Sequence, residues 1–297
     1  MPQQKHYTAP VSEINRKDCE TLVRLALEED APSGDSTSES IFNKTDTGSA
    51  RVIARESGVL CGIPVIEILL EIYFEMTGQT VMLRPHFRDG LLFQKGDTLF
   101  TLEGSLISLF RLERILLNFV QYLSGISTVT AKAVETAPEN LVILDTRKTL
   151  PGYRKLVKYA VFCGGGSNHR ISLSDMAMIK DNHIASIKSI QNAIKSIRIE
   201  NPGIPVEVEV DTLQQLESVL NYKIDAVLLD NMDGDTLKKA IDMIRKQQNP
   251  PFIEISGNIT PEKFSELKDL GQIGVSMGYL THTTRFLDLS MELTRNK

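Results

Sequence analysis

The chain lacks several patterns that mark common kinds of site and segment. Its three cysteines, Cys19, Cys61 and Cys163, include no CxxC pair, which argues against a zinc knuckle or a disulfide framework and favours a reduced, cytoplasmic protein. Neither an HExxH motif nor a GK[ST] phosphate loop is present. The apolar runs are too short to cross a bilayer, and the first residues lack the apolar core of a signal peptide.

The chain also lacks an excess of positive charge, since its formal net charge is −5 and its isoelectric point is near 5.7. This balance argues against a general nucleic-acid binder, because such proteins present an extended basic face. The hydrophobic and charged fractions, 41% and 24%, are those of an ordinary soluble globular protein. With 297 residues, the chain is long enough for one large domain or two of ordinary size.

One segment departs from this acidic background. Residues 145–183 contain seven lysines and arginines against three aspartates, together with two of the five histidines and the glycine triplet 164–166. A basic, glycine-containing segment in an acidic chain predicts a site for a small ligand with several negative charges. The alternative is a solvated basic face that binds nothing.

The first third of the chain has the pattern of an α+β region. Helical spacing of apolar residues predicts helices over residues 15–29 and 63–74. A long helix follows over residues 108–136, in which Gly125 is a candidate kink or end point. Short stretches bounded by turn residues predict a largely antiparallel sheet.

Beyond residue 140, short apolar strands alternate with helical segments. The predicted strands are Val142–Leu144, Met176–Ile179, Val206–Val210, Ala226–Leu229, Phe252–Ile255 and Ile273–Ser276. The predicted helices are Ile184–Ile199, Leu213–Leu220, Asp235–Gln247 and Pro261–Leu270. Strands joined by helical crossovers form a parallel sheet, either a barrel or an open doubly wound sheet.

Polar or glycine residues stand at the end of each of these strands. They are Asp145, Arg147, Lys148, Lys180, Glu209, Asp230, Ser256, Gly257, Ser276 and Gly278. In a βα barrel the carboxyl ends of the strands build the active site, whereas an open sheet binds ligands at its switch point. The use of all six strand ends therefore favours a barrel.

The ends of the last two strands have the features of a phosphate site. The stretches Ser256-Gly257-Asn258 and Ser276-Met277-Gly278 allow backbone N–H groups to approach phosphate oxygens, and a helix beginning near Thr260 adds a favourable dipole. Ordinary turn chemistry is the alternative explanation for each stretch.

Two carboxylates, Glu209 and Asp230, end neighbouring strands. One interpretation is that they form salt bridges with Lys148 and Lys180. The other is that they bind Mg²⁺ carried by a polyphosphate, because Mg²⁺ takes one or two carboxylates together with phosphate oxygens. Carboxylates at this position can also stabilise a sugar cation.

The histidines give a weaker signal than the carboxylates. The glycine triplet is interpreted as a hinge that lets residues 168–170 face the ligand, Asn168 among them. His169 lacks the clustered cysteines or histidines of a zinc site. His183 and His282 are further candidates for contact with the ligand.

Longer motifs resemble one known family. The stretches DTRKTLPGYRKLVKYAVFCGGGSNHR, IKDNH, VEVEVDT, LLDNM, EISGNI and VSMGYLTH resemble the quinolinate phosphoribosyltransferases, as do LEEDAPSGDSTS and LERILLNFVQYLSGIST nearer the start. The order and spacing of DTRKT, GGGxNHR and KDNH are highly specific, whereas the SG and SxG loops alone are not.

The resemblance implies an N-terminal α/β sandwich domain, residues 1–115, to which the C-terminal segment 284–297 returns. It implies an incomplete α/β barrel of six or seven strands over residues 116–283. The implied reaction transfers phosphoribosyl from 5-phosphoribosyl 1-diphosphate to quinolinate and yields nicotinate mononucleotide, CO2 and diphosphate, with Mg²⁺ required. Family members are dimers, sometimes larger assemblies, in which an arginine of one subunit completes the partner's site, and Arg114 matches that arginine.

The resemblance also implies a role for each residue of the site. The quinolinate carboxylates would contact Arg147, His169, Arg170, Lys180 and, from the neighbouring subunit, Arg114. The implied catalytic residues are Lys148 on the diphosphate and ribose side, where Lys180 would also bind the substrate, and Glu209 and Asp230 on the ribose hydroxyls and Mg²⁺. The 5′-phosphate would lie against Ser256, Gly257, Asn258, Ser276 and Gly278. Asn258 stands where many relatives have glycine, and asparagine tolerates the left-handed backbone better than most residues.

Three alternatives remain open. The closest is the related branch associated with molybdenum transport, although GGGSNHR and IKDNH fit the quinolinate enzymes better. A phosphosugar lyase would use Lys148 or Lys180 as a Schiff-base amine at the barrel mouth. A metabolite sensor on the same scaffold would bind without turnover.

Overall fold

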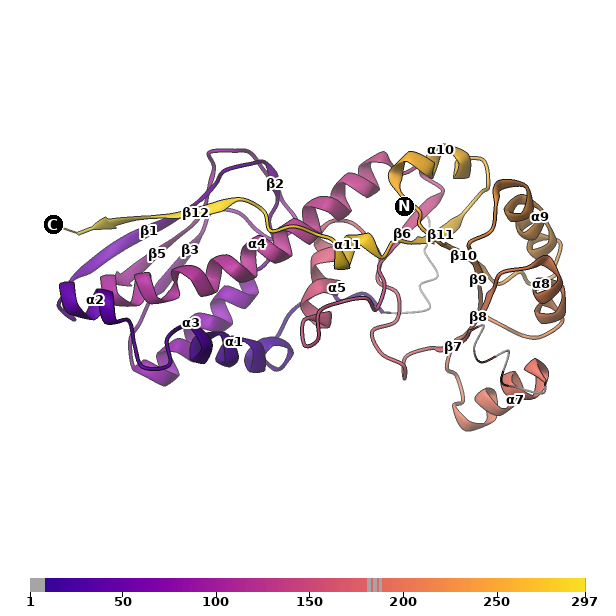
Figure 1. Cartoon of the computed structure of the whole chain (residues 1–297), viewed down its shortest axis with the longest axis horizontal. Coiled ribbons are helices and arrows are strands. Elements are labelled where there is room, and N and C mark those ends of the chain that lie inside the picture. The colour runs from indigo at the N-terminus through magenta and orange to yellow at the C-terminus, as the bar shows by residue number, and fades with distance from the viewer. Residues whose placement is uncertain (1–8, 181–182, 184–185, 187–188, 297) are drawn as a thin grey trace. The chain divides into compact units, whose positions relative to one another are not determined.

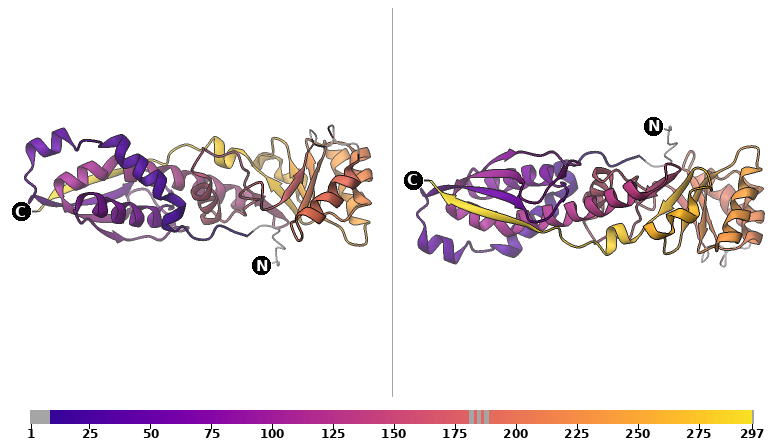
Figure 2. Two further views of the ribbon diagram at one scale, coloured as in Figure 1. Left: turned by 90° about the horizontal axis from the view of Figure 1, so that it is seen from below. Right: turned by 90° about the horizontal axis from the view of Figure 1, so that it is seen from above.

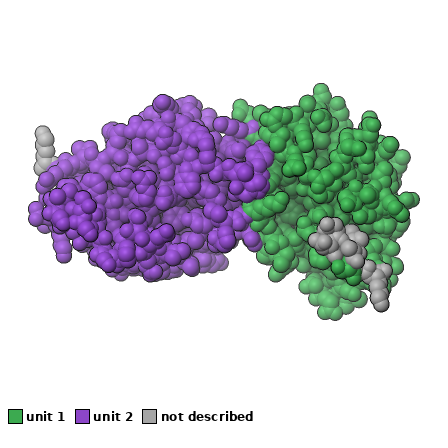
Figure 3. Space-filling view, in the orientation of Figure 1, with its two compact units in different colours: residues 1–10, 133–148, 166–278 green, residues 11–132, 149–165, 279–297 purple. Residues whose placement is uncertain are grey.

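The structure, a computed structural model, describes residues 9–180, 183, 186 and 189–296. The chain divides into two compact units (Figure 3). Unit 1 comprises residues 1–10, 133–148 and 166–278, and unit 2 comprises residues 11–132, 149–165 and 279–297. The expected domain limit after residue 115 falls inside one continuous helix, α4 (Leu106–Thr136), so the units do not follow that limit.

Unit 2 contains an antiparallel sheet of four strands. Their order is β12 (Leu289–Arg295), β1 (Thr47–Ala54), β5 (Thr98–Ser105) and β3 (Met82–Pro85). The C-terminal strand pairs with β1 over seven residues, from Gly48 opposite Arg295 to Ala54 opposite Leu289. A separate short pair joins β2 (Gly58–Val59) to β4 (Leu92–Phe93).

Helices pack beside this sheet (Figure 1). Helix α1 (Arg16–Asp30) begins at a capping box formed by Asn15 and Asp18. Helix α3 (Ile63–Thr77) has a proline in its first turn and ends at Gly78 in the left-handed conformation, the two punctuation residues expected there. Three further helices in the described part of unit 2 were not predicted: α2 (Ser36–Ile41), α5 (Arg154–Cys163) and the short α11 (Tyr279–His282). The N–H groups of Thr37 and Ser38 in α2 donate to the Asp35 carboxylate.

Unit 1 contains six parallel strands. Their order is β6 (Leu141–Leu144), β11 (Ile273–Ser276), β10 (Phe252–Ser256), β9 (Ala226–Asp230), β8 (Val206–Val210) and β7 (Ala177–Ile179). Helices α7 (Ile190–Glu200), α8 (Leu213–Leu220), α9 (Gly234–Arg245) and α10 (Phe264–Leu267) lie along the outer face of this curved sheet (Figures 1 and 2). Strands β6 and β7 are the two edges, so the predicted incomplete α/β barrel is confirmed with six strands.

The predicted strands of this unit match the observed ones within a residue or two at each end. The helix expected over residues 261–270 is instead a single 3-10 turn, Pro261–Lys263, followed by the four residues of α10. The first part of the helix expected from Ile184 lies largely outside the described residues. Across the described chain, no helix combines the length and the apolar character needed to span a bilayer.

Gly125 neither ends nor interrupts α4. A Cβ atom at this position would lie 2.2 Å from the carbonyl oxygen of Arg285 and 3.1 Å from Cγ2 of Thr284. The glycine is therefore explained by the close approach of the C-terminal segment to the helix within unit 2.

We expect Gly125→Ala to lower the melting temperature of the protein. Alanine favours a helix over glycine by about 1 kcal/mol, but forcing a methyl group into this contact costs about 1–3 kcal/mol. Gly234→Ala is the matched control, because Gly234 opens α9 and a methyl group added there would have no heavy atom within 4 Å. Thermal unfolding followed by circular dichroism would measure both, and an unchanged melting temperature for Gly125→Ala would contradict the packing argument.

Candidate active site

The carboxyl ends of the six parallel strands meet at one edge of the sheet in unit 1. In the observed register Ser256 lies opposite Asp230, and Ser276 lies opposite Leu144, the residue before Asp145. Glu209 is the penultimate residue of β8, and Lys180 directly follows β7. The arrangement predicted from the strand ends is therefore present, with charged, hydroxyl and glycine groups along a single edge.

Asp145 anchors the segment that follows the glycine triplet. Its carboxylate is fully buried and accepts hydrogen bonds from Nδ2 of Asn168 at 2.7 Å and from the backbone N–H of His169 at 2.8 Å. Ser167 adds a parallel bridge to Leu144, with its N–H donating to the carbonyl of Ile143 at 2.8 Å. Residues 167–169 thus lie along the edge of β6 and place His169 and Arg170 beside the sheet.

The glycine triplet itself has packing reasons that the sequence does not reveal. A Cβ atom on Gly164 would lie 2.5 Å from the carbonyl oxygen of Ser127, and Gly165 has φ +82, in the region that favours glycine. Gly164 also ends α5, because its N–H donates to the carbonyl of Ala160. The hinge interpretation stays a prediction.

His169 is buried between two acidic residues that the sequence patterns did not single out. Its Nε2 lies 3.2 Å from Oε2 of Glu207 and 3.3 Å from Oε2 of Glu254, and both glutamates are fully buried. Glu207 projects from β8 two residues before Glu209, and Glu254 projects from β10 two residues before Ser256. A charged residue within an otherwise apolar parallel strand was the available signal, because buried charges are rare unless they are paired.

The two glutamates shift the protonation of this cluster. Burial opposes the charged imidazole, but the negative charges of Glu254 and Glu207 outweigh it and raise the pKa of His169 to about 10. Burial and the neighbouring Glu254 raise the pKa of Glu207 to about 7. The Arg170 N–H donates to Nδ1 of His169 at 2.8 Å, which would suit a neutral ring. That hydrogen bond stabilises the neutral ring by about 1 kcal/mol. The two buried carboxylates stabilise the charged ring by more than this, so the imidazolium is favoured.

Two arginines lie close together beside this cluster. Arg170 is 5% exposed, and its guanidinium donates to the carbonyl of Met176 at 2.9 Å. Burial lowers the pKa of Arg170, and the positive charge of Arg147 lowers it further, which places the two guanidinium groups near each other. Within the described residues, Nε of Arg147 is buried and has no hydrogen-bond partner. Like charges and an unpaired buried donor are costly without an anion, so this pair fits a carboxylate-binding site.

One of the predicted salt bridges, between Lys180 and Glu209, is present in the structure. Nζ of Lys180 lies 2.9 Å from Oε2 of Glu209. The carboxylate of Asp230 accepts a hydrogen bond from Nδ2 of Asn231 at 2.6 Å. Lys148 is exposed, and its backbone N–H donates to Oγ1 of Thr146 at 3.1 Å. Glu209 and Asp230 lie at the ends of adjacent strands. Mg²⁺ is usually bound by one or two protein carboxylates together with substrate phosphates, and this pair provides two.

The loop after β10 has the backbone of an anion cradle. Asn258 has φ +49, which confirms that asparagine takes the left-handed conformation here. Gly257 has φ +109, and a Cβ atom on it would lie 2.3 Å from Oδ1 of Asn231, so no other residue fits. The backbone N–H of Asn231 donates to the carbonyl of Ser256 at 3.1 Å and holds the loop after β9 against this one.

Ser276 has a different environment from the rest of the predicted phosphate site. Its hydroxyl donates to Oε1 of the buried Glu254. The stretch Gly274–Gly278 also matches the GxSxG pattern of hydrolases, but a serine that donates to a buried glutamate is not an activated nucleophile. The structure thus gives Ser276 a role in supporting the His169 cluster.

Three further candidates are His183, next to Lys180 in unit 1, and His282 and Arg114, which belong to unit 2. His183 is exposed, and its Nδ1 accepts from the backbone N–H of Lys180 at 3.1 Å. His282 belongs to unit 2. Arg114, also in unit 2, is exposed on α4 one turn from Phe110 and one turn from Asn118, which are exposed as well.

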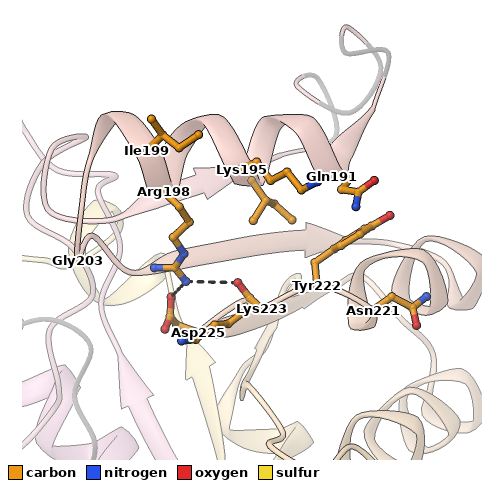
Figure 4. Close-up of a pocket in the computed structure, with 10 residues that line it drawn as sticks. Gln191, Lys195, Arg198, Ile199, Gly203, Asn221, Tyr222, Lys223 and Asp225 are labelled. Atoms are coloured by element: carbon orange, nitrogen blue, oxygen red, sulfur yellow. Dashed lines mark hydrogen bonds and ion pairs between the residues drawn. The ribbon is translucent and has the colours of Figure 1, made fainter.

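A pocket of about 690 Å³ lies elsewhere in unit 1 (Figure 4). It is lined by α7 and by residues 221–225, which precede β9, so it borders the amino ends of the strands. Arg198 in this pocket is paired with Asp225 at 2.6 Å and donates to the carbonyl of Lys223 at 3.3 Å. Its position at the opposite strand ends separates it from the candidate site.

Comparison with known proteins agrees with the geometry. The family model described as quinolinate phosphoribosyl transferase, C-terminal domain, matches residues 126–292, and its N-terminal counterpart matches residues 35–124. The chain belongs to the quinolinate phosphoribosyl transferase family.

Individual members of this family are similar over nearly their whole length. The nicotinate-nucleotide pyrophosphorylase [carboxylating] of Mycobacterium leprae is 36% identical over 93% of this chain and 99% of its own. The probable enzyme of the same name from Bacillus subtilis is 37% identical, with 95% of each chain covered. The crystal structure of NadC from Streptococcus pyogenes is 37% identical, with a TM-score of 0.88 over 96% of this chain and 99% of that one.

We expect Glu254→Gln to lower the pKa of His169 by about 1–3 units, because it removes one of two carboxylates within ion-pair distance of Nε2. Histidine-detected NMR would follow the titration, with the resonance assigned through His169→Gln. For the wild-type protein we expect an imidazole that stays charged up to a pH near 10, the raised pKa of His169. Glu266→Gln, an exposed glutamate of α10, is the control and leaves the titration unchanged. An unaltered His169 titration in Glu254→Gln would show that Glu254 does not hold the proton.

Proposed function

We propose that the protein transfers the phosphoribosyl group of 5-phosphoribosyl 1-diphosphate to quinolinate, with loss of CO2, to give nicotinate mononucleotide and diphosphate for NAD synthesis. The observation that carries this proposal is the pair Arg147 and Arg170 beside the charged His169, since three clustered cations call for a ligand with more than one carboxylate. Quinolinate has two adjacent carboxylates, whereas nicotinate has one. The names of the relatives carry the same activity.

The guanidinium groups bind and orient the acceptor. Arginine forks pair with carboxylates bidentately, so two of them fix the pyridine ring in position as well as in charge. Arg170 is held by the carbonyl of Met176, and His169 is held by Asp145 and the two glutamates. A ring held this way presents its nitrogen to the sugar carbon in a near-attack arrangement, and such positioning lowers the barrier by removing orientational freedom.

The carboxylates at the strand ends stabilise the sugar. Departure of diphosphate leaves positive charge on the ribose carbon, and Glu209 and Asp230 supply fixed negative charge beside it. Lys148 and Lys180 offset the charge of the departing diphosphate. Once the nitrogen–carbon bond forms, the pyridinium nitrogen withdraws electrons, and the adjacent carboxylate leaves as CO2.

We further propose Mg²⁺ as the cofactor. Glu209 and Asp230 would hold the ion together with phosphate oxygens of the substrate, and the ion supplies charge neutralisation of the diphosphate. The fit rests on two partly buried carboxylates at the ends of adjacent strands, of which Asp230 lies opposite Ser256, the first residue of the backbone cradle 256–258.

We also propose a cytoplasmic homodimer with no nucleic-acid or membrane partner. The three cysteines are free, which suits a reducing compartment. Arg114 is a cation on an exposed helix face, available to a second copy of the chain.

Pure protein mixed with quinolinate, 5-phosphoribosyl 1-diphosphate and Mg²⁺ should release diphosphate and form nicotinate mononucleotide, while nicotinate in place of quinolinate gives no product. Lys148→Ala should lower the rate by at least about 100-fold, since it removes a charge on the leaving group. Lys155→Ala, a lysine of the same basic segment that pairs with Asp18 at 3.4 Å, is the control and keeps full activity. Binding of both substrates without any product would favour the sensor alternative.

Arg114→Ala and Arg147→Ala proteins should each be inactive alone and regain activity when mixed. If Arg114 acts in the partner's site, a mixed dimer contains one site that lacks both arginines and one intact site. Mixing after reversible subunit dissociation therefore restores up to about a quarter of the wild-type rate, because half of the dimers are mixed and each has one site in two. Absence of recovery after subunit exchange, verified with mass-tagged chains, would rule out a shared site.

A further inference from the structure

A second cluster of potential metal ligands lies in unit 2 and takes no part in the proposed reaction. The Sγ atoms of Cys61 and Cys163 and a carboxylate oxygen of Asp89 all lie within 4.8 Å of one another. Cys61 directly precedes the turn into α3, Asp89 lies in the turn before β4, and Cys163 is the last residue of α5. Three segments that are distant in sequence thus bring two thiols and a carboxylate together.

We propose that Cys61, Asp89 and Cys163 form a binding site for a thiophilic divalent cation, with Zn²⁺ as the ion whose preferred ligands they match. Zinc is bound at about 2.3 Å by cysteine sulfur and about 2.0–2.2 Å by carboxylate oxygen, usually with four ligands in a tetrahedron. Ligand atoms within 4.8 Å of one another can surround one such ion. The proposal is independent of the phosphoribosyl transfer.

A glycine directly follows each of the three proposed ligands, and it allows the tight backbone turn on which that ligand stands. Gly62 has φ +127 and Gly90 has φ +84, conformations that other residues rarely adopt. Gly164 lacks room for a Cβ atom, which would meet the carbonyl oxygen of Ser127 at 2.5 Å. The three ligands therefore stand on tight backbone turns that larger residues would displace.

Hydrogen bonds fix the first two ligands further. The backbone N–H of Cys61 donates to Oγ of Ser124 at 3.0 Å, and that hydroxyl donates back to the Cys61 carbonyl at 3.2 Å, both in buried surroundings. Asp89 accepts from the backbone N–H groups of Gly62 at 2.8 Å and Ile63 at 3.1 Å. Tyr159 donates its hydroxyl to Oδ2 of Asp89 at 3.1 Å, the type of outer contact that orients a carboxylate ligand.

The burial of the cluster favours a cation over a disulfide. In the part of the chain that the structure describes, Asp89 forms no salt bridge with a lysine, arginine or histidine. Cys61 is fully buried, which shields its thiol from oxidants in solution. A divalent ion would displace the two thiol protons and bond to the carboxylate, so the net charge of the cluster would stay the same.

Access comes through Cys163. Its side chain is half-buried while that of Cys61 is fully buried. An ion can enter from the Cys163 side and keep a water molecule as its fourth ligand, because a site with three protein ligands leaves one tetrahedral position.

Reduced, EDTA-treated protein dialysed against Zn²⁺ in excess Mg²⁺ would test the proposal. Excess Mg²⁺ occupies sites made of oxygen ligands alone, so retained zinc reports a thiolate site. We expect one zinc per chain, and Co²⁺ in its place should give thiolate-to-cobalt charge-transfer absorption. Cys163→Ser should lose both signals, Tyr159→Phe should weaken zinc binding by about 10-fold or more, and Cys19→Ser should keep both.

Zinc retained equally by Cys163→Ser and wild-type protein would overturn the proposal, as would the absence of retained zinc in the wild type. A different result would show the cluster to be a redox-active thiol pair instead. In that case the wild-type protein would bind no zinc, and peroxide would lower its mass by two hydrogen atoms, as expected for a disulfide, only when Cys163 is present. Circular dichroism of each variant would separate loss of ligand from loss of fold. Diphosphate release measured on the same samples keeps the outcome for phosphoribosyl transfer distinct from the outcome for zinc.

Discussion

The buried carboxylate of Asp145 is the contact on which the rest of the site depends. It stands at the end of β6 and accepts from the side chain of Asn168 and the backbone of His169, so it fastens the segment after the glycine triplet to the free edge of the sheet. The contacts of His169 with two glutamates and of Arg170 with the carbonyl of Met176 then complete the placement of this segment. A buried carboxylate that accepts two hydrogen bonds is also stable as an anion in surroundings where an unpaired one would be costly.

The cations of the site are fixed from within the protein. His169 is charged because two glutamates inside the barrel face its ring, and Ser276 in turn donates to one of those glutamates. Arg170 is fixed by a backbone carbonyl. Glu207 and Glu254 are fully buried, and their charge is paired with His169 inside the protein. This pairing lets a basic site exist in a chain whose net charge is −5.

Much of this architecture could be predicted from the sequence because it depends on the spacing of apolar and polar residues within short segments. Apolar strands alternating with helices indicated the parallel sheet, and the polar residues that end those strands marked its functional edge. The two compact units do not divide near residue 115, because α4 continues through it. The resemblance implied the return of the C-terminal segment that forms β12, but not the addition of helix α5 to unit 2. Glu207 and Glu254 were missed since only tertiary structure shows which face of a buried strand meets His169. Gly125 was wrongly expected to kink or end its helix, and its cause, like one cause of Gly164, is the close approach of backbone from another segment.

The pairing of β12 with β1 also orders events during synthesis. Every residue of unit 1 is translated by position 278, so its parallel sheet has all six strands before the chain is complete. The sheet of unit 2 begins at Thr47 yet waits for Leu289–Arg295 to cover the outer edge of β1. Until residues 289–295 pair with it, the outer edge of β1 presents unpaired backbone groups that can attract other strands. The sheet that begins first along the chain is therefore closed by a strand that lies after all of unit 1, and a protein cut between residues 278 and 289 would keep the six strands of unit 1 but expose a strand edge in unit 2.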